Sequence, residues 1–208
     1  MSSKLKKTRP ELLKQRRALT LFKRYLPTLV LKKQQIQMEI LKVRTERGRL
    51  LEEMKKRISK VERWVPLFSE MIPGPVTELV RVRSIQRGEK NVAGIVLPTV
   101  KDVSYEVKPY SRYFTPPWTD LAVDFVKALL ELRERTRILT EQERLLQAEL
   151  RKVTQRVNLF EKVMIPRTVE NTRLIRIHLG EEQVAGVGRA KIAKSKTVES
   201  PAGMEVQS

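Results

Sequence analysis

Few side chains in this sequence have the type and spacing that catalysis or metal binding requires. His178 is the single histidine and cysteine is absent, so disulfides, thiol catalysis and cysteine-based zinc sites are excluded. A lone imidazole without a second histidine at ligand spacing is far more often a helix-surface residue than a ligand or a general base. We therefore expect no catalytic residue, no metal site and no bound cofactor.

The phosphate-binding motifs are missing too. The sequence contains neither the glycine-rich loop that ends in Gly-Lys-Ser/Thr nor the three-glycine dinucleotide fingerprint. Acidic pairs such as Glu52 with Glu53 and Glu131 with Glu134 lie among basic neighbours on predicted helices. Such residues ordinarily form i,i+3 and i,i+4 ion pairs on a solvated face. The sequence predicts a chain that is not itself an enzyme.

Basic residues are concentrated at the start of the chain. The formal net charge is +19, and residues 1–33 hold 11 Lys and Arg against the single acid Glu11. Such a block favours an acidic partner, which could be nucleic acid, a membrane surface or a protein. Aromatic residues are not interleaved with the basic ones, so no stacking platform for nucleic acid is indicated. No stretch approaches the ~20 apolar residues of a membrane span, and we expect no direct membrane insertion.

A seven-residue apolar repeat runs through the first part of the chain. Between Leu12 and Trp64 it alternates steps of three and four, and twelve of sixteen positions are apolar. This pattern predicts a coiled-coil helix, because only a left-handed supercoil keeps a strict seven-residue repeat facing its partner over such a length. The two seams are Leu12, Leu19, Leu26, Lys33, Ile40, Arg47, Met54 and Val61, and Gln15, Phe22, Leu29, Ile36, Val43, Leu50, Arg57 and Trp64.

Two charged residues interrupt this seam in a way that invites a functional interpretation. Lys33 and Arg47 occupy seam positions, where burying a charge costs stability. Such residues commonly set the register of a coil or mark where a third protein touches it. The alternative is a side chain at the rim whose charged end reaches water, and the sequence leaves both open.

A second helical arm is predicted after the break at Pro116-Pro117, with Thr119 or a neighbour as a cap. One seam is apolar at eight of nine positions and its companion at five of nine. Pro27 and Pro166 lie inside the arms, and each removes a helical hydrogen bond and should bend its helix. The seams are Trp118, Phe125, Leu132, Leu139, Leu146, Val153, Phe160, Arg167 and Leu174, and Ala122, Leu129, Thr136, Glu143, Leu150, Val157, Met164, Asn171 and His178.

The segment between the arms has a different character. Leu79–Ile85 alternates in strand fashion, Arg87–Lys90 has the composition of a turn, and Val92–Leu97 is an apolar run that ends at Pro98, so we predict a β-hairpin. Loops are expected at Pro73–Pro75 and Pro109–Pro117. The predicted fold is mainly α, a long antiparallel two-helix coiled coil with a small β-hairpin-containing middle region. Its parts are an N-terminal arm over 1–64, the middle region over 65–117, a C-terminal arm over 118–196 and a disordered tail over 197–208.

Four strings resemble, in family order, the signatures of the D subunit, the central rotor stalk component of V-type and A-type ATPases (ATP synthases). They are TRPELL at 8–13, LKKQQI at 31–36, NVAGIVLP at 91–98 and QRVNLFEKVMIPR at 155–167, and the resemblance covers about residues 8–196. The last string is the most specific. The residues that match the signatures are Lys32, Lys33, Asn91, Val92, Ala93, Gly94, Leu97, Pro98, Arg156, Val157, Asn158, Glu161, Ile165 and Pro166.

Three features depart from the family pattern. Leu159-Phe160 replaces small or polar residues, Pro27 is unusual in the first arm, and glycines interrupt the last helix. The sequence does not decide whether that helix continues from Gly180 to Gly188.

The resemblance implies a rotor shaft that transmits torque between ATP hydrolysis or synthesis in a catalytic head and H⁺ or Na⁺ translocation in a membrane ring. It implies contacts with the catalytic A and B subunits, with the small F subunit of the stalk and with the funnel-shaped d (or C) subunit on the ring. It also implies a peripheral location on the cytoplasmic side of the membrane. Antiparallel arms would bring basic residues of both chain ends to one tip, which we expect to face the head. These residues are Lys14, Arg16, Arg17, Lys23, Arg24, Arg173 and Arg176.

Two other functions are compatible with a basic coiled coil. One is a shaft-like component of a flagellar or type III export ATPase, for which a plain helical hairpin without β-structure is expected. The other is a nucleic-acid-binding coiled coil, whose binding would fall steeply with salt.

Overall fold

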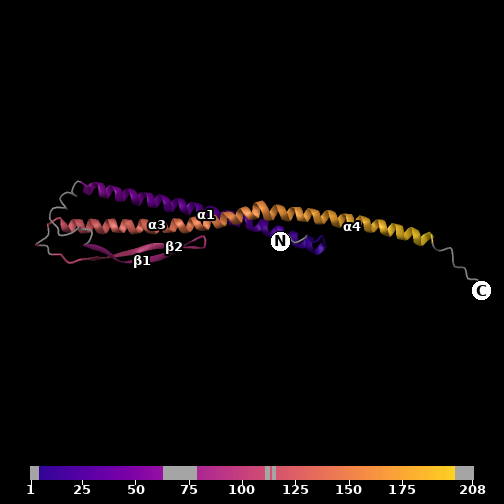
Figure 1. Ribbon diagram of the computed structural model, residues 1–208, viewed down its shortest axis with the longest axis horizontal. Helices are drawn as coiled ribbons and strands as arrows, with labels where there is room; N and C mark the ends of the chain where they lie inside the picture. Colours follow the sequence, from indigo (N-terminus) through magenta and orange to yellow (C-terminus); the bar gives the residue numbers. More distant parts are fainter. Residues whose placement is uncertain (1–4, 63–78, 111–112, 114–115, 200–208) are drawn as a thin grey trace, which may run out of the picture. The chain divides into compact units, whose positions relative to one another are not determined.

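The computed structural model describes residues 5–62, 79–110, 113 and 116–199 (Figure 1). The elements are α1 (Arg9–Glu62), β1 (Val80–Val92), β2 (Ile95–Val107), α3 (Thr119–Leu159), the π turn η2 (Phe160–Met164) and α4 (Ile165–Glu199). The predicted mainly α fold with a central β-hairpin is confirmed.

The residue contacts group the chain into two compact units, Leu31–Thr154 and Met1–Val30 with Gln155–Ser208, which are described separately below.

In the unit Leu31–Thr154, the second part of α1 and most of α3 run antiparallel (Figure 1). The predicted seams supply most of the buried apolar residues, because their repeat places them on one face of each helix, while Val123 and Ile138 are buried outside the seams. Ile36 and Leu146 are fully buried, and other buried seam residues are Ile40, Val43, Leu50, Leu132 and Val153. Trp64 of the predicted seam and the predicted loop at Pro73–Pro75 lie outside the described residues.

The hairpin is longer than predicted, and its turn lies elsewhere. β1 and β2 pair antiparallel from Val80↔Val107 to Val92↔Ile95. Residues 87–90 are therefore part of β1, and the prediction of a turn at Arg87–Lys90 is wrong. The turn is Ala93-Gly94, whose φ angles are 51° and 79°. Two consecutive residues with positive φ form the two-residue turn that matches the twist of a hairpin. The Asn91 side-chain carbonyl accepts a hydrogen bond from the Gly94 N–H at 3.0 Å.

Gly88, which the sequence suggests as a turn residue, and Pro98, which it suggests as the end of a strand, both lie within the paired part of β1 and β2. Gly88 is buried opposite Thr99, and an added Cβ would lie 2.8 Å from Thr99 Oγ1 and from Lys101 Cε. The glycine therefore permits close packing rather than a turn. Pro98 pairs with Glu89 within β2, so the strand does not end there. In a two-stranded sheet every strand has an unpaired edge that tolerates proline.

Thr119 begins α3 after the predicted break, and it is almost completely buried. Its hydroxyl donates a hydrogen bond to the Pro116 carbonyl at 2.7 Å. The side chain thus holds the preceding turn, whereas a cap would accept a hydrogen bond from a helical N–H.

In the unit formed by Met1–Val30 and Gln155–Ser208, α1 contacts the π turn. The rings of Phe22 and Phe160 meet edge to face, with centroids 5.3 Å apart and an interplanar angle of 81°. This geometry is favoured by the opposite charges of ring faces and edges. Phe160, one of the two residues that depart from the family pattern, therefore contributes an aromatic contact between α1 and η2.

The predicted seam loses its phase at this π turn. Leu174, a predicted seam residue, is 40% exposed, whereas the next residue, Ile175, is fully buried. Thr168 is buried where Arg167 was predicted, and Arg167 is exposed. A π turn contains one residue more than an α turn, which rotates the following helix by about 100° relative to the seven-residue repeat. The seam prediction is therefore wrong beyond η2.

Pro166 accounts for the position of this π turn. Proline has no N–H, and its ring clashes with the carbonyl four residues earlier in a regular helix. Here the Ile165 N–H bonds to the Phe160 carbonyl, five residues back. The wider turn directly before Pro166 accommodates the ring without ending the helix.

α4 continues through its three glycines to Glu199, so the helix is continuous where the sequence left the question open. It includes residues 197–199 at the start of the predicted tail, and residues 200–208 lie outside the described part. No described helix is long and apolar enough to cross a membrane.

Candidate functional site

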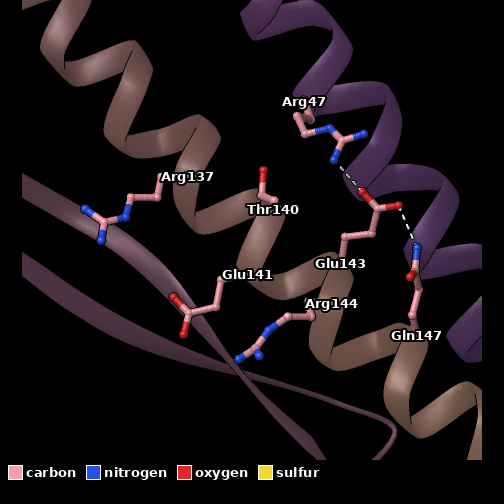
Figure 2. A pocket seen from close by; sticks show the side chains of 7 residues that line it. All are labelled: Arg47, Arg137, Thr140, Glu141, Glu143, Arg144 and Gln147. Carbon is pink, nitrogen blue, oxygen red and sulfur yellow. Dashed lines mark hydrogen bonds and ion pairs between the residues drawn. The ribbon is translucent and has the colours of Figure 1, made fainter.

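The polar centre of the unit Leu31–Thr154 is a buried carboxylate held by two arginines. Glu143 of α3 is buried, with a side chain only 9% exposed. Arg44 Nε lies 2.6 Å from its Oε1 and Arg47 Nη1 lies 2.7 Å from its Oε2. Figure 2 shows Glu143 pointing towards Arg47 of α1, with Gln147 on its other side, where the Gln147 amide donates to Oε1 at 2.9 Å.

This geometry favours the charged form of the carboxyl group. The hydrogen bond from Arg44 lowers the pKa of Glu143 below its ordinary value, and the positive charges of Arg47 and Arg44 act in the same direction, while burial opposes them. A carboxylate that accepts hydrogen bonds from two helices can satisfy its lone pairs in only a narrow range of relative positions. The cluster therefore fixes the register of α1 against α3 in this unit.

Arg47, Glu143 and Gln147 also line an open hollow of about 500 Å³, together with Arg137, Thr140, Glu141 and Arg144 of α3 (Figure 2). Its lining residues include cations and carboxylates but no histidine or serine. Among the residues that the structure describes, no group of acidic or histidine side chains could hold a metal ion. The arrangement can bind oppositely charged side chains and hold the two helices together.

Two further polar contacts attach the hairpin to the helices. Lys90 of β1 donates to Glu39 of α1 at 2.7 Å, and Gln142 of α3 donates to the Pro98 carbonyl of β2 at 2.5 Å. The hydrogen bond from Lys90 lowers the pKa of Glu39, although burial of this carboxyl group acts in the opposite direction. For Tyr105 of β2, burial and the charge of Glu131 on α3 raise the pKa. The hairpin thus bridges both helices.

Sequence reasoning identifies part of this site. Arg47 stands out as a charged seam residue, and Glu143 is a polar position of the companion seam, but their pairing is not predicted. Glu39, Lys90 and Gln142 are missed. The sequence offered one indication of these contacts, since Glu39 is a carboxylate directly before the seam residue Ile40. Lys33, the other charged seam residue, is half-buried in α1.

The predicted tip residues lie in the other unit, on the surface of their helices. All seven are exposed, five on α1 and two on α4. Arg173 forms an ion pair with Glu170 at 2.9 Å, one turn away, which raises the pKa of the arginine and lowers that of the glutamate, mainly through their hydrogen bond. The structure places these cations on exposed helix surface, and their binding to a catalytic head stays a prediction.

Two of the four signature strings contain the irregular parts of the backbone, whereas the strings at 8–13 and 31–36 belong almost entirely to α1. The Asn91–Pro98 string contains the hairpin turn with Ala93 and Gly94, and its Leu97 is buried. The Gln155–Arg167 string contains η2 and Pro166. In it Val157 is buried and Ile165 half-buried, while Arg156, Asn158, Glu161 and Pro166 are exposed. Lys32 is half-buried, and its Nζ would lie 3.9 Å from a Cβ on Gly94.

Comparisons with known proteins identify the family of this chain. The family model described as the ATP synthase D subunit matches residues 11–195. The V-type ATP synthase D subunit of Borreliella burgdorferi is 40% identical over 196 residues, which cover 94% of this chain and 96% of the relative. The V-type ATP synthase D subunits of Chlamydia abortus and Chlamydia felis are 33% and 30% identical, and each match covers 94% of this chain and 95% of the relative. The chain therefore belongs to the family of ATP synthase D subunits.

Proposed function

We propose that this chain is the central shaft of a V-type rotary ATPase and transmits torque between ATP hydrolysis or synthesis in the catalytic head and H⁺ or Na⁺ translocation in the membrane ring. Family membership makes it one component of a multi-subunit complex. The observation that supports the mechanical role is the buried cluster of Arg44, Arg47 and Glu143. A helix pair that carries torque must resist sliding of one helix along the other, and this cluster opposes such sliding because a displaced carboxylate would be buried without partners.

The proposal assigns a partner to each part of the chain. The exposed cations Lys14, Arg16, Arg17, Lys23 and Arg24 would face the A and B subunits of the head. The small F subunit of the stalk and the funnel-shaped d or C subunit would bind the remaining part, on the cytoplasmic side of the membrane. The chain itself would be non-catalytic and would act through its helices.

The tip contacts should be diffuse, because many weak contacts can be exchanged while a shaft turns. Single alanine substitutions at the five cations of α1 should each have a small effect, since exposed ion pairs contribute little. Neutralising all five should weaken binding to the head and flatten its dependence on ionic strength, because salt screens exposed charge. A single substitution that abolishes binding, or an unchanged salt slope in the five-fold variant, would show a specific site instead.

The shaft function can be tested by immobilising the chain against the head. The chain has no cysteine, and Val184 of α4 is 75% exposed, so Val184→Cys can carry a cleavable photo-crosslinker in a complex whose other accessible cysteines have been replaced. Crosslinking to the head should stop ATP hydrolysis and ion transport together, and cleavage of the linker should restore both. Full ATPase activity in the crosslinked complex would contradict the proposal.

A further inference from the structure

The hairpin formed by β1 and β2 supplies its own backbone pairing. The two strands pair with each other from the base of the hairpin to its turn. Below the base, the Lys108 N–H donates to the Leu79 carbonyl at 2.9 Å. An element whose backbone pairing is internal can leave its neighbours without breaking that pairing. The hairpin therefore does not need the helices to keep its strands paired.

Few side chains attach the turn end of the hairpin to the helices of the unit Leu31–Thr154. Leu97 is only 1% exposed, and a sheet of two strands buries such a side chain only against another layer. Next to it, Gln142 of α3 donates to the Pro98 carbonyl at 2.5 Å. Lys90, the strand partner of Leu97, donates to Glu39 of α1 but keeps a side chain that is 57% exposed. These attachments combine one buried leucine with two polar contacts.

Towards the base, one buried group of the hairpin is unsatisfied. The Tyr105 hydroxyl of β2 is inaccessible to water and has no hydrogen-bond partner among the residues that the structure describes. Besides burial, the charges of Glu131 and Arg135 of α3 act on the pKa of Tyr105, so the hydroxyl lies beside that helix. Glu131 is held by Arg135 at 2.5 Å and not by the tyrosine.

The unpaired hydroxyl weakens the docked position of the hairpin. A hydroxyl that is buried without a partner loses its hydrogen bonds to water and gains none in return. Tyr105 would recover those bonds as soon as the hairpin moved away from α3 and water reached it. The same ring without its hydroxyl would not incur this cost.

We propose that the hairpin is a releasable flap, which leaves the helix pair as one unit while α1 and α3 stay together, and that the unpaired Tyr105 hydroxyl promotes this release. Local opening of this kind involves elements that have few buried contacts and a backbone paired within themselves. The docked state is held by Leu97, the Lys90–Glu39 contact and the Gln142 hydrogen bond. The released state is favoured by hydration of Tyr105.

This inference concerns a motion within one unit and does not depend on the proposed transmission of torque. A hairpin could open on a turning shaft or on a stationary stalk. The experiment reads the accessibility of a buried position in the full-length chain and not ATPase activity, so failure of one proposal is distinguishable from failure of the other.

The first experiment measures release with a single cysteine. The chain has no native cysteine, so Leu97→Cys reports release of the hairpin by its rate of alkylation under native conditions. Val153→Cys is the matched control, since Val153 is also 1% exposed but belongs to the seam of α3. The thiol at position 97 should react at least about tenfold faster, and its rate should change little in dilute urea, because local opening exposes less surface than unfolding. Equal rates with the same urea dependence would show that the hairpin opens only when the chain unfolds, and would overturn the proposal.

The second experiment tests the role of the hydroxyl in the Leu97→Cys background. Tyr105→Phe should slow alkylation by about tenfold, because the docked state no longer buries an unpaired group. Tyr110→Phe is the matched control, since its hydroxyl already donates to Asp120, and it should not slow the reaction. Glu39→Gln should accelerate alkylation by about threefold to tenfold, because it removes the charge that holds Lys90. Equal circular dichroism of all variants would show that the fold is kept, and an unchanged or faster rate in Tyr105→Phe would overturn the role given to the hydroxyl.

Discussion

Glu143 is the buried carboxylate that joins the two helices of the unit Leu31–Thr154. It is buried, it accepts contacts from Arg44 and Arg47 at 2.6 and 2.7 Å, and its pKa is lowered chiefly by the hydrogen bond from Arg44. A group with a lowered pKa in the folded state adds stability above its unfolded pKa and loses that contribution as the pH falls through its folded pKa. The pKa of Glu39 is also lowered, chiefly by the hydrogen bond from Lys90, so its contribution to stability depends on pH in the same way.

Replacement of this carboxylate tests the cluster. Glu143→Gln should lower the free energy of unfolding by about 1–3 kcal/mol at neutral pH, because it removes the charge from two charge-assisted contacts. The deficit relative to the wild type should shrink as the pH falls below the ordinary carboxyl pKa of 4.5, where the wild-type group also becomes protonated. Urea unfolding followed by circular dichroism at several pH values measures this difference.

Glu141→Gln is the matched control, since Glu141 lines the same hollow and is only half-buried. It should change the unfolding free energy little. A deficit for Glu143→Gln that stays constant between neutral and acid pH would mean that the charge of Glu143 does not stabilise the fold.

At this scale the sequence identifies charged seam positions but not their partners. Periodicity marks which face a residue occupies, so Arg47 and Glu143 are visible as exceptions on apolar faces. It carries no information about contacts such as Lys90 with Glu39, which are 51 residues apart and depend on where the hairpin lies. Those contacts need the tertiary structure.

Among the elements, the π turn η2 changes which residues of α4 are buried. The seven-residue repeat predicts Arg167 and Leu174 for the seam, and the structure buries Thr168 and Ile175 instead. The sequence contains the cause, since Pro166 cannot follow a regular turn. The sequence does not show whether the helix accommodates Pro166 by bending or by a turn with one extra residue, because that depends on packing against α1.

A deletion experiment tests this interpretation. Removing Lys162 together with Pro166→Ala should convert η2 into a regular turn and leave Ile175 buried, because the extra residue of the turn is lost. Removing Glu170 with Pro166 kept, so that η2 persists, should rotate Ile175 out of the interface by about 100°. Ile175→Cys in each background, the only cysteine of the chain, reports burial by its rate of alkylation.

The thiol should be protected in the first background and reactive in the second. Equal reactivity in both backgrounds would show that η2 does not set the phase of α4.

The hairpin gives a similar lesson about glycine. Gly88 has turn-like neighbours, but it packs opposite Thr99, and the turn uses Gly94 with Ala93. The sequence shows where a glycine is, but it does not show whether the glycine allows a neighbouring strand to pack closely or allows a turn with positive φ. The strand pairing decides between these two roles. The existence of the hairpin was therefore predictable, and its register was not.

The end of α4 should be a weak helix, since Gly180, Gly186 and Gly188 each lower helix stability. A Cβ at any of the three would meet nothing within 4 Å, so alanine should be accepted without strain. Replacing all three should stabilise the helix by roughly 0.5–1 kcal/mol per site and slow amide hydrogen exchange over residues 180–192. Gly48→Ala, an open site on α1, should leave exchange in that segment unchanged. Unaltered exchange in the triple variant would mean that glycine does not limit this helix.

For the whole molecule, charge and composition agree with the proposed role. The net charge of +19 is concentrated in residues 1–33. A shaft needs helices that hold their register and a surface whose contacts can be exchanged. The Glu143 cluster supplies the first property, and the exposed cations of α1 are proposed to supply the second.

The most direct test of the account is to observe whether this chain turns. The assembled complex would be immobilised through its head, and a bead would be attached to the chain through Tyr113→Cys, at a position that is 98% exposed in a chain without native cysteine. Addition of ATP should produce sustained rotation of the bead in one direction, and a crosslink between Val184→Cys and the head should stop it. A bead that stays still while the same complexes hydrolyse ATP would contradict the assignment of this chain as the rotating shaft.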